Sequence, residues 1–201
     1  MAPPAAPLDS APLSVRAARA YLRLLQSSPI LTKSVSSAII SALADLSAQT
    51  ILRNKRFNLS SAGNYALMGL VITGPATHHF HRLLDRWLPP TLPAAAFLRL
   101  AADRLLFGPV FLLVTLYVLN RLEGHCHDST VFMLKNGFLP MFKANLKFWV
   151  PLSYINVNYV SQEYRVLFGN VCAFFWIIIM ASKRRRTALR EAARRDREEE
   201  E

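Results

Sequence analysis

The stretch LLFGPVFLLVTLYVL, residues 105–119, carries no charged side chain over fifteen positions. A second stretch, VLFGNVCAFFWIIIMA at residues 166–181, has none over sixteen positions, and a run of four basic residues follows it closely at 183–186. A helix needs about 20 residues to cross the roughly 30 Å hydrocarbon core of a bilayer. These stretches therefore predict membrane-spanning helices, and the basic run predicts where one of them leaves the bilayer.

Two further apolar stretches, near residues 30–52 and 64–84, contain strongly polar side chains. These are Lys33, Asp45, Gln49, His78, His79, His81 and Arg82. Lipid penalises such groups by several kcal/mol unless they face protein or water. The predicted fold class is therefore all-α: a multi-span integral membrane bundle whose helices enclose something polar.

The pattern predicts four transmembrane helices with additional interfacial helices. The expected spans are residues 30–52, 64–84, 97–122 and 166–182. They lie in one membrane domain, residues 29–182, between an N-terminal arm at 1–28 and a charged tail at 183–201. Residues 88–95 and 123–142 are expected to be loops, the second with a possible short helix.

The segment at residues 143–165 is ambiguous, because it is too polar for a lipid-facing span but rich in aromatic residues that suit an interface. Both chain ends are basic, so the positive-inside rule favours placing both in the cytosol. That placement requires an even number of spans. A fifth span through 143–160 would put the two ends on opposite sides.

The arm begins with a proline-rich segment, and an amphipathic helix is expected at residues 15–26. The arm is compatible with a mitochondrial presequence, but a cytosolic arm anchored at lipid headgroups is favoured. Ser28 and Pro29 have the pattern of a helix cap followed by proline in the first turn. The charge pattern of the tail predicts a solvated helix with paired charges.

Composition excludes several classes of function. The net charge of +11 is concentrated at the ends of apolar segments, which is typical of membrane anchors rather than of nucleic-acid binding. Two cysteines give no disulfide framework. Signatures of hydrolases, zinc proteases, phosphate loops and CxxC motifs are absent. We therefore expect no enzyme activity, no cofactor and no nucleic-acid partner.

The first span has a polar side and an apolar side. At 100° per residue, Ser34, Ser37, Ser41, Asp45 and Gln49 fall in one sector of about 120°. Ile39, Leu43 and Leu46 lie opposite. The polar face has two interpretations, the lining of a pore or hydrogen bonding that fixes the packing of helices, and the sequence leaves both open.

Charged and histidine residues form a second set of candidates. Arg99 and Asp103 are four apart and can pair along one helix face, whereas Arg104 could pair with Asp45 or Asp85. His78 and His81 have a spacing that could chelate a metal, as could the loop cluster at 125–128. Neither has a matching Cys/His pair, so we expect no metal site.

Several short sequence motifs occur in a characteristic order along the chain. They are Leu31-Thr32-Lys33 with Asp45 and Gln49; Gly74-Pro75 with His78; Asp103-Arg104 with Gly108-Pro109; Trp149, Pro151, Asn156 and Arg165; and Trp176 with Ala181-Ser182. Together they resemble the small four-span family of peroxisomal and mitochondrial membrane proteins that includes the Mpv-seventeen protein. The resemblance covers roughly residues 20–182.

The resemblance implies a channel in the peroxisomal membrane that passes small hydrophilic metabolites, non-selectively or with a weak preference for anions. The alternatives are a non-conducting membrane organiser and a mitochondrial inner-membrane channel of the same family. Expected partners are the bilayer, small metabolites, further copies of the chain and the peroxisomal membrane-protein import machinery.

The residues expected to matter fall into three groups. Candidates for the pore lining are Ser37, Ser41, Asp45, Gln49, His78 and Asp103. Bends that widen or gate the passage are expected at Gly74, Pro75, Gly108 and Pro109. Interfacial positions are expected at Trp149, Pro151, Asn156 and Arg165.

Overall fold

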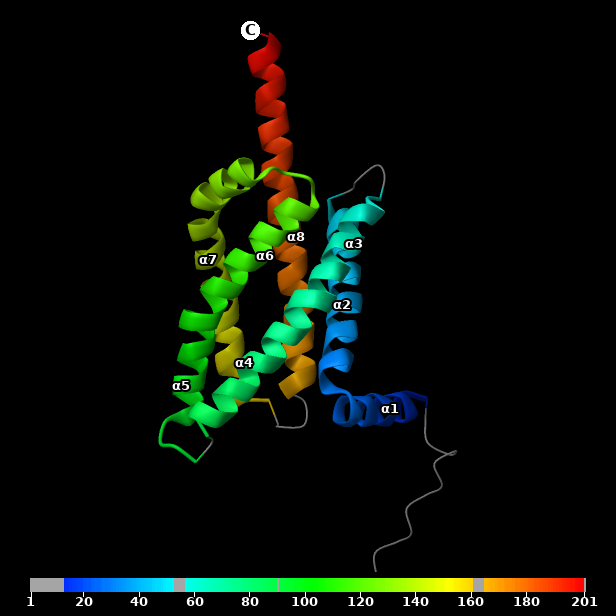
Figure 1. The fold of residues 1–201 in the computed structure, drawn as a ribbon, viewed down its shortest axis with the longest axis vertical. Helices are drawn as coiled ribbons and strands as arrows, with labels where there is room; N and C mark the ends of the chain where they lie inside the picture. The colour runs from blue at the N-terminus through cyan, green and yellow to red at the C-terminus, as the bar shows by residue number, and fades with distance from the viewer. Residues whose placement is uncertain (1–12, 53–56, 90, 161–164, 201) are drawn as a thin grey trace, which may run out of the picture.

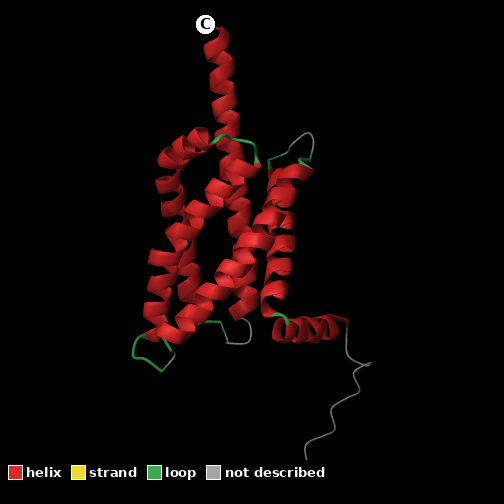
Figure 2. Ribbon diagram, viewed as in Figure 1, coloured by secondary structure: helices red, strands yellow, loops and turns green. Residues whose placement is uncertain are grey.

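The computed structural model describes residues 13–52, 57–89, 91–160 and 165–200. All regular structure in these residues is helical (Figure 2). The helices are α1 (Leu13–Ser27), α2 (Pro29–Ile51), α3 (Leu59–Met68), α4 (Gly74–Trp87), α5 (Ala95–Ala102), α6 (Gly108–Leu122), α7 (His127–Asn158) and α8 (Arg165–Glu200). π-helical turns at Gly69–Thr73 and Asp103–Phe107 join α3 to α4 and α5 to α6 without a break.

The described helices form an up-and-down bundle (Figure 1). We call the end where α1 extends sideways from the start of α2 the α1 end, and the opposite end, where α8 leaves the bundle, the tail end. α2 runs toward the tail end, α3–α4 returns, α5–α6 runs back again, α7 returns, and α8 crosses once more and projects beyond the other helices. The described part of the chain therefore makes five passes.

The fifth pass corrects the expected topology. The segment at 143–165 was expected either to span or to lie at the interface, and residues 127–142 were expected to be largely loop. Instead, α7 is one 32-residue helix with Pro140 and Pro151 in its interior. Its polar residues do not all face outward, since Asn145 is buried. As a result α1 and the projecting end of α8 lie at opposite ends of the bundle, not at the same end.

The other helix predictions are close to the structure. α2 begins one residue before the expected 30–52, with Ser28 at the cap position and Pro29 in the first turn, although the Ser28 side chain makes no capping bond. α3 begins at Leu59, earlier than the expected residue 64, because the Asn58 side chain accepts a hydrogen bond from Ser61 N and caps the helix there.

The polar face of α2 is turned inward, as predicted. Ser34, Ser41, Asp45 and Gln49 are buried, while Ile39 and Leu43 on the opposite side are exposed. This is the reverse of the arrangement in a helix at the surface of a water-soluble protein. It suits a helix whose outer surface contacts hydrocarbon.

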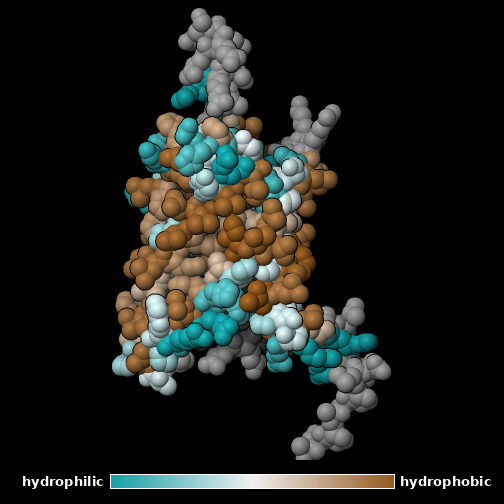
Figure 3. Space-filling model, viewed as in Figure 1, coloured by the Kyte–Doolittle hydropathy of each residue, from teal (hydrophilic) through white to brown (hydrophobic). Residues whose placement is uncertain are grey.

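On the face shown in Figure 3, exposed apolar side chains form a broad band between polar ends, which we call the apolar belt. Large residues such as Leu106, Val110 and Val71 are more than half exposed. Contiguous apolar surface on this scale is rare in soluble monomers. Among the described residues, Pro29–Ile51 and Ala95–Leu122 are long and apolar enough to cross a bilayer.

An apolar core fills the interior between the passes. Its buried members are Ala48, Tyr65, Met68, Leu112, Leu116, Leu119, Met141, Trp176, Met180 and Ala181. They come from α2, α3, α6, α7 and α8, so all five passes contribute to the core. The centre of the bundle is therefore occupied by side chains.

Small residues bring α2 against the α3–α4 pass. A Cβ atom at Gly69 would lie 2.5 Å from Ser37 O, and one at Gly74 would lie 2.7 Å from Ser34 N and closer still to Ser34 Cα. Neither helix has room for a larger side chain at these crossings. Close backbone approach through small residues is a common way to join helices in a bilayer.

We expect Gly74→Ala to destabilise the bundle by about 1–3 kcal/mol, because the added methyl group meets backbone atoms of Ser34 in addition to its side chain, and the backbone cannot rotate away. Thermal unfolding of the purified protein in detergent, followed by far-UV circular dichroism, measures the change. Gly63→Ala in α3 is the matched control, since its Cβ would enter open space. Equal stability of the two variants would contradict the proposed close contact.

Candidate functional site

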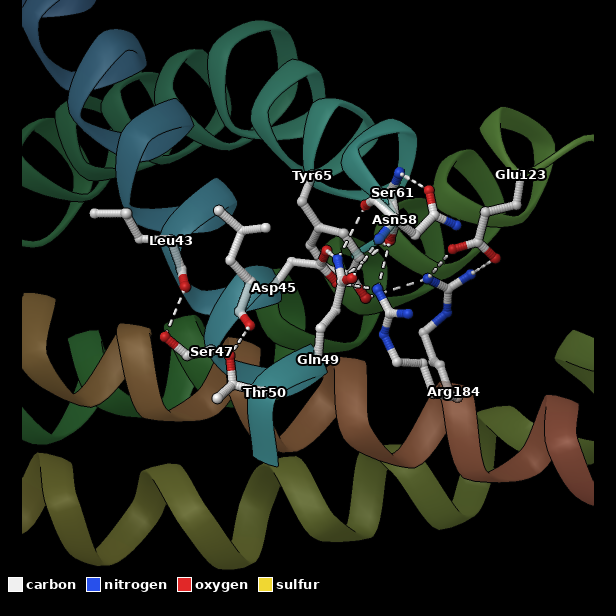
Figure 4. A network of polar contacts seen from close by, with 12 residues as sticks. Leu43, Asp45, Ser47, Gln49, Thr50, Asn58, Ser61, Tyr65, Glu123 and Arg184 are labelled. Carbon is white, nitrogen blue, oxygen red and sulfur yellow. Dashed lines mark hydrogen bonds and ion pairs between the residues drawn. The ribbon is translucent and has the colours of Figure 1, made fainter. Parts of the chain in front are cut away.

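A network of polar side chains lies inside the tail end of the bundle (Figure 4). The first part joins α2 to α3. Gln49 Nε2 donates to Asp45 Oδ2 at 2.8 Å and to Asn58 O at 3.0 Å, while Asn58 N donates to Gln49 Oε1 at 2.6 Å. Ser61 Oγ donates to Asp45 Oδ1 at 3.3 Å. Asp45 and Gln49 are 0% exposed, so this part of the network is closed to solvent.

The charge of Asp45 is balanced by an arginine from a distant part of the chain. Arg185 Nη2 of α8 lies 2.8 Å from Asp45 Oδ1 and 2.9 Å from Ser61 Oγ. An unpaired carboxylate in a dry interior is very costly, whereas a paired and hydrogen-bonded one is tolerated. This ion pair therefore fixes the end of α8 against α2 and α3.

The preceding residue, Arg184, holds the other side of the bundle. Its guanidinium forms two hydrogen bonds with the Glu123 carboxylate, at 3.0 and 2.9 Å, and donates to the Tyr65 hydroxyl at 3.2 Å. It also donates to Asn120 Oδ1 of α6. We call the nine residues of these bonds the tail-end network: Asp45, Gln49, Asn58, Ser61, Tyr65, Asn120, Glu123, Arg184 and Arg185.

Arg184 remains charged in this setting. Burial alone would lower the pKa of its guanidinium, but the Tyr65 hydroxyl and the Glu123 carboxylate outweigh that effect and raise the pKa above its ordinary value. A bidentate arginine–carboxylate pair is among the stronger hydrogen-bonded arrangements in proteins.

A depression of about 940 Å³ opens outside this network at the tail end. We call it the vestibule. α3, α6, α7 and α8 all contribute to its wall. Its exposed basic residues are Lys183, Arg186 and Arg190, whereas the one acid in its lining, Glu123, is paired with Arg184. Asn58, Asn64, Asn136 and Ser60 add neutral polar groups. The vestibule therefore has a mixed wall of apolar and polar side chains, and its exposed charges are positive.

A second polar cluster lies toward the α1 end. Arg104 contacts Asp103 Oδ2 at 2.9 Å, donates to Ser153 Oγ at 3.0 Å, and lies over the Trp149 ring at 4.8 Å from its centroid. Lys33 Nζ lies 3.4 Å from His78 Nδ1 in the same half of the bundle. These contacts tie α7 to the π-helical turn before α6 and tie α2 to α4.

Two ion-pair predictions were wrong. Arg99 pairs with Asp85 at 2.9 Å instead of with Asp103. Arg104 pairs with its neighbour Asp103, and neither Asp45 nor Asp85 is its partner. The Arg99 guanidinium is directed to the end of α4 instead, where it donates to Leu88 O at 2.7 Å as well as to Asp85.

The structure separates the six candidates for a pore lining into different environments. Asp45 and Gln49 belong to the tail-end network. His78 and Asp103 lie in the polar half near α1, and His78 is buried. Ser41 is buried on α2, and the backbone of Ser37 meets Gly69. The six residues therefore lie in two polar clusters, at the tail end and toward the α1 end, and on the face of α2 between them.

The remaining predicted residues are placed as follows. Gly74-Pro75 and Gly108-Pro109 each follow a five-residue π-helical turn, so the helix is irregular at both. Trp149 contacts Arg104, and Pro151 is exposed on α7. Asn156 lies near the end of α7. Arg165 begins α8, and its side chain lies outside the described residues.

Sequence reasoning missed Arg184 and Arg185, which it treated only as membrane-flanking anchors. A weak signal for them existed: Asp45 on the inward face of a span requires a buried countercharge. Among the described residues, no group of three or more His, Cys, Asp or Glu side chains could hold a metal ion.

Removing one member of the Asp45–Arg185 pair should be costly. We expect Asp45→Asn to destabilise the protein by about 3 kcal/mol, because Arg185 is left partly buried without its carboxylate. Asp85→Asn is the control, since Asp85 is 66% exposed in its own ion pair and should cost about 0.5 kcal/mol or less.

Unfolding in detergent measures both variants. The double variant Asp45→Asn/Arg185→Gln should lose clearly less than the sum of its single variants, because the two side chains interact directly. Additive losses, or an Asp45→Asn effect as small as that of Asp85→Asn, would contradict the assigned pair.

Comparison with known proteins supports the resemblance found in the sequence. The family model for the Mpv17 / PMP22 family matches residues 120–181. The chain is 40% identical to Peroxisomal membrane protein 2 of Bos taurus, over 90% of this chain and 98% of that protein. It is 33% identical to PXMP2/4 family protein 3 of Dictyostelium discoideum, over 86% and 95% of the two chains.

A mitochondrial relative is also similar. The Mitochondrial inner membrane protein Mpv17 of Caenorhabditis briggsae is 25% identical over 86% of this chain and 96% of that protein. No solved structure matches the chain. The expected location in the peroxisomal membrane, with the mitochondrial inner membrane as its alternative, agrees with the names of these relatives. With such relatives aligned along most of its length, the chain belongs to the Mpv17 / PMP22 family of membrane proteins.

Proposed function

We propose that the protein spans the peroxisomal membrane with the five passes of its bundle and conducts small hydrophilic metabolites. The apolar belt matches the hydrocarbon core, and the polar ends match the headgroup regions (Figure 3). The observation that carries the proposal is the vestibule: a depression with exposed basic side chains that opens at one polar end of the bundle and reaches the polar network inside it. The proposal assigns no catalytic reaction to the chain.

In this proposal the tail-end network closes the inner side of the vestibule. Arg184 and Arg185 hold α8 against α2, α3 and α6, and the apolar core lies behind them. A hydrophobic constriction of this kind conducts when its walls separate enough for water to enter. The irregular helices at Gly74-Pro75 and Gly108-Pro109 supply positions where the walls could bend.

Association of several copies remains part of the proposal. The core of one chain is filled by side chains, so a route between copies is the alternative to a route through one chain. The size of the largest solute that leaves liposomes containing the protein, compared with the subunit number in detergent, separates the two routes.

The vestibule should favour anions over cations. Three exposed basic side chains line it, and its one acidic lining residue is already paired. Surface charge of one sign raises the local concentration of the opposite ion, and the effect falls with salt because the screening length is about 8 Å at physiological ionic strength.

We expect Lys183→Gln/Arg186→Gln/Arg190→Gln to lower the anion-to-cation permeability ratio by roughly threefold to fivefold at low salt. Reversal potentials across a planar bilayer with asymmetric KCl measure this ratio for purified protein. The control is Lys135→Gln/Lys143→Gln/Lys147→Gln, which removes the same charge from exposed positions on α7 outside the vestibule. An equal change in both variants would exclude the vestibule as the source of selectivity.

A non-conducting membrane organiser is the second candidate. It is favoured by one observation: Asp45 and Gln49 are saturated by protein partners and closed to solvent. In this case purified, folded protein would give no conductance in a planar bilayer and no solute release from liposomes. For a channel, Asp45→Leu should alter the conductance by releasing Arg185 at the inner side of the vestibule.

A further inference from the structure

α1 lies at the edge of the bundle where polar and apolar surfaces meet. It extends sideways at the α1 end, level with the ends of α4 and α7 (Figure 1). Exposed aromatic side chains stand at those helix ends: Trp87 is the last residue of α4, Tyr159 follows α7, and both are more than two thirds exposed. Tryptophan and tyrosine concentrate where the hydrocarbon core of a bilayer meets the headgroups. α1 is therefore placed at headgroup level.

The direction of α1 is fixed by hydrogen bonds at its junction with α2. Thr32 Oγ1 lies 2.9 Å from Leu24 O and 2.8 Å from Ser28 O, and Ser28 N donates to Leu24 O at 2.9 Å. Pro29, in the first turn of α2, has no N–H group and interrupts the continuation of α1 into α2. Because α2 is a membrane pass, this junction holds α1 along the membrane surface and not across the bilayer.

The arginines of α1 form one row. At 100° per residue, Arg16, Arg19 and Arg23 fall within a sector of about 60° that extends for about 10 Å along the helix, and all three side chains are exposed. We call them the arginine row. The chain has no acidic residue between Asp9 and Asp45, so no carboxylate at helical neighbour spacing offsets this charge.

The opposite half of α1 is apolar. Its larger side chains are Val15, Tyr21, Leu22, Leu24 and Leu25. The two leucines nearest the edges of this half, Leu22 and Leu24, are each more than half exposed. A helix with arginines on one side and leucines on the other lies in the plane of the bilayer surface, with its apolar side at the boundary of the acyl chains.

We propose that α1 lies in the headgroup layer of the protein's own bilayer and binds anionic phospholipids through the arginine row. Guanidinium groups match the geometry of phosphate oxygens, and an anionic headgroup layer attracts clustered basic residues. The sequence predicts only that the arm meets headgroups, whereas the structure supplies the fixed direction of α1, its level and the face that carries the charge. The inference rests on the membrane position of the bundle and not on conduction.

Other occupants satisfy only one side of α1. A water-soluble acidic protein would match the arginine row but leave the leucines of the opposite side in water. A second copy could cover the leucines, but its own α1 carries the same positive charge. An anionic bilayer supplies phosphates to one side and acyl chains to the other, so it is the occupant that both sides favour.

Hydrogen exchange of the full-length chain in nanodiscs tests the proposal. Mass spectrometry follows the peptides that cover α1 in nanodiscs of phosphatidylcholine, with and without phosphatidylserine, at low salt. We expect phosphatidylserine to slow the exchange of α1 amides about tenfold in the unaltered chain, and high salt to remove most of this difference. Amides of α6, inside the bundle, should exchange equally in both lipids.

The test variant is Arg19→Leu/Leu22→Arg/Arg23→Leu/Leu24→Arg. It keeps the composition and net charge and alters only exposed positions, but it spreads the arginines around the helix. We expect phosphatidylserine to slow its α1 exchange by less than about twofold. A second variant, Arg16→Gln/Arg19→Gln/Arg23→Gln, leaves the apolar side intact and should exchange at the same rate in both lipids.

Four results would overturn the proposal. An equal response of the unaltered and rearranged chains would mean that net charge alone accounts for it. Equal protection of the unaltered α1 with and without phosphatidylserine would remove the role of the arginine row. Fast exchange of α1 in both lipids would favour a protein partner, and protection only in discs that hold two copies would favour a second copy.

Discussion

The buried ion pair between Asp45 and Arg185 is the constraint on which the rest of the structure depends. Asp45 is fully enclosed on a helix whose outer face is apolar, so its charge has no access to water. A carboxylate in this position is tolerated only with a paired cation and further hydrogen bonds. Arg185, Ser61 and Gln49 supply them. The ion pair therefore fixes the position of α8 along α2 and α3. Apolar side chains fill the remaining space between these helices.

Adjacent arginines can hold opposite sides of the bundle because a helix turns by about 100° per residue. Arg185 faces α2 and α3, whereas Arg184 reaches Glu123 and Asn120 near the end of α6. α7 contributes no residue to this network and meets α6 and α8 largely through apolar side chains such as Met141 and Phe148. The polar bonds at the tail end thus hold four passes, whereas α7 is tied by polar contacts nearer the α1 end, where Arg104 bonds Ser153 and lies over Trp149.

The sequence predicts the helices of strong apolar pattern well and the long-range contacts poorly. α1, α2 and the α5–α6 pass lie within two residues of their expected bounds, because proline, cap residues and charge mark their ends. The inward face of α2 was correct because helical periodicity depends only on local order. α7 was misjudged because its polar residues were assumed to face lipid. The partner of Asp45 lies 140 residues away, and no local pattern distinguishes Arg185 from its three basic neighbours.

The odd number of passes changes how the basic ends must be interpreted. Both ends of the bundle carry basic residues. The positive-inside rule must therefore compare the number of basic residues at one end with the number at the other. Arg16, Arg19 and Arg23 belong to the α1 end, whereas Lys183, Arg184, Arg185 and Arg186 follow the last pass at the tail end, with Arg190, Arg194 and Arg197 beyond. The larger number of basic residues at the tail end favours placing that end in the cytosol. In that orientation the vestibule opens toward the cytosol, and α1 lies at the opposite face of the membrane.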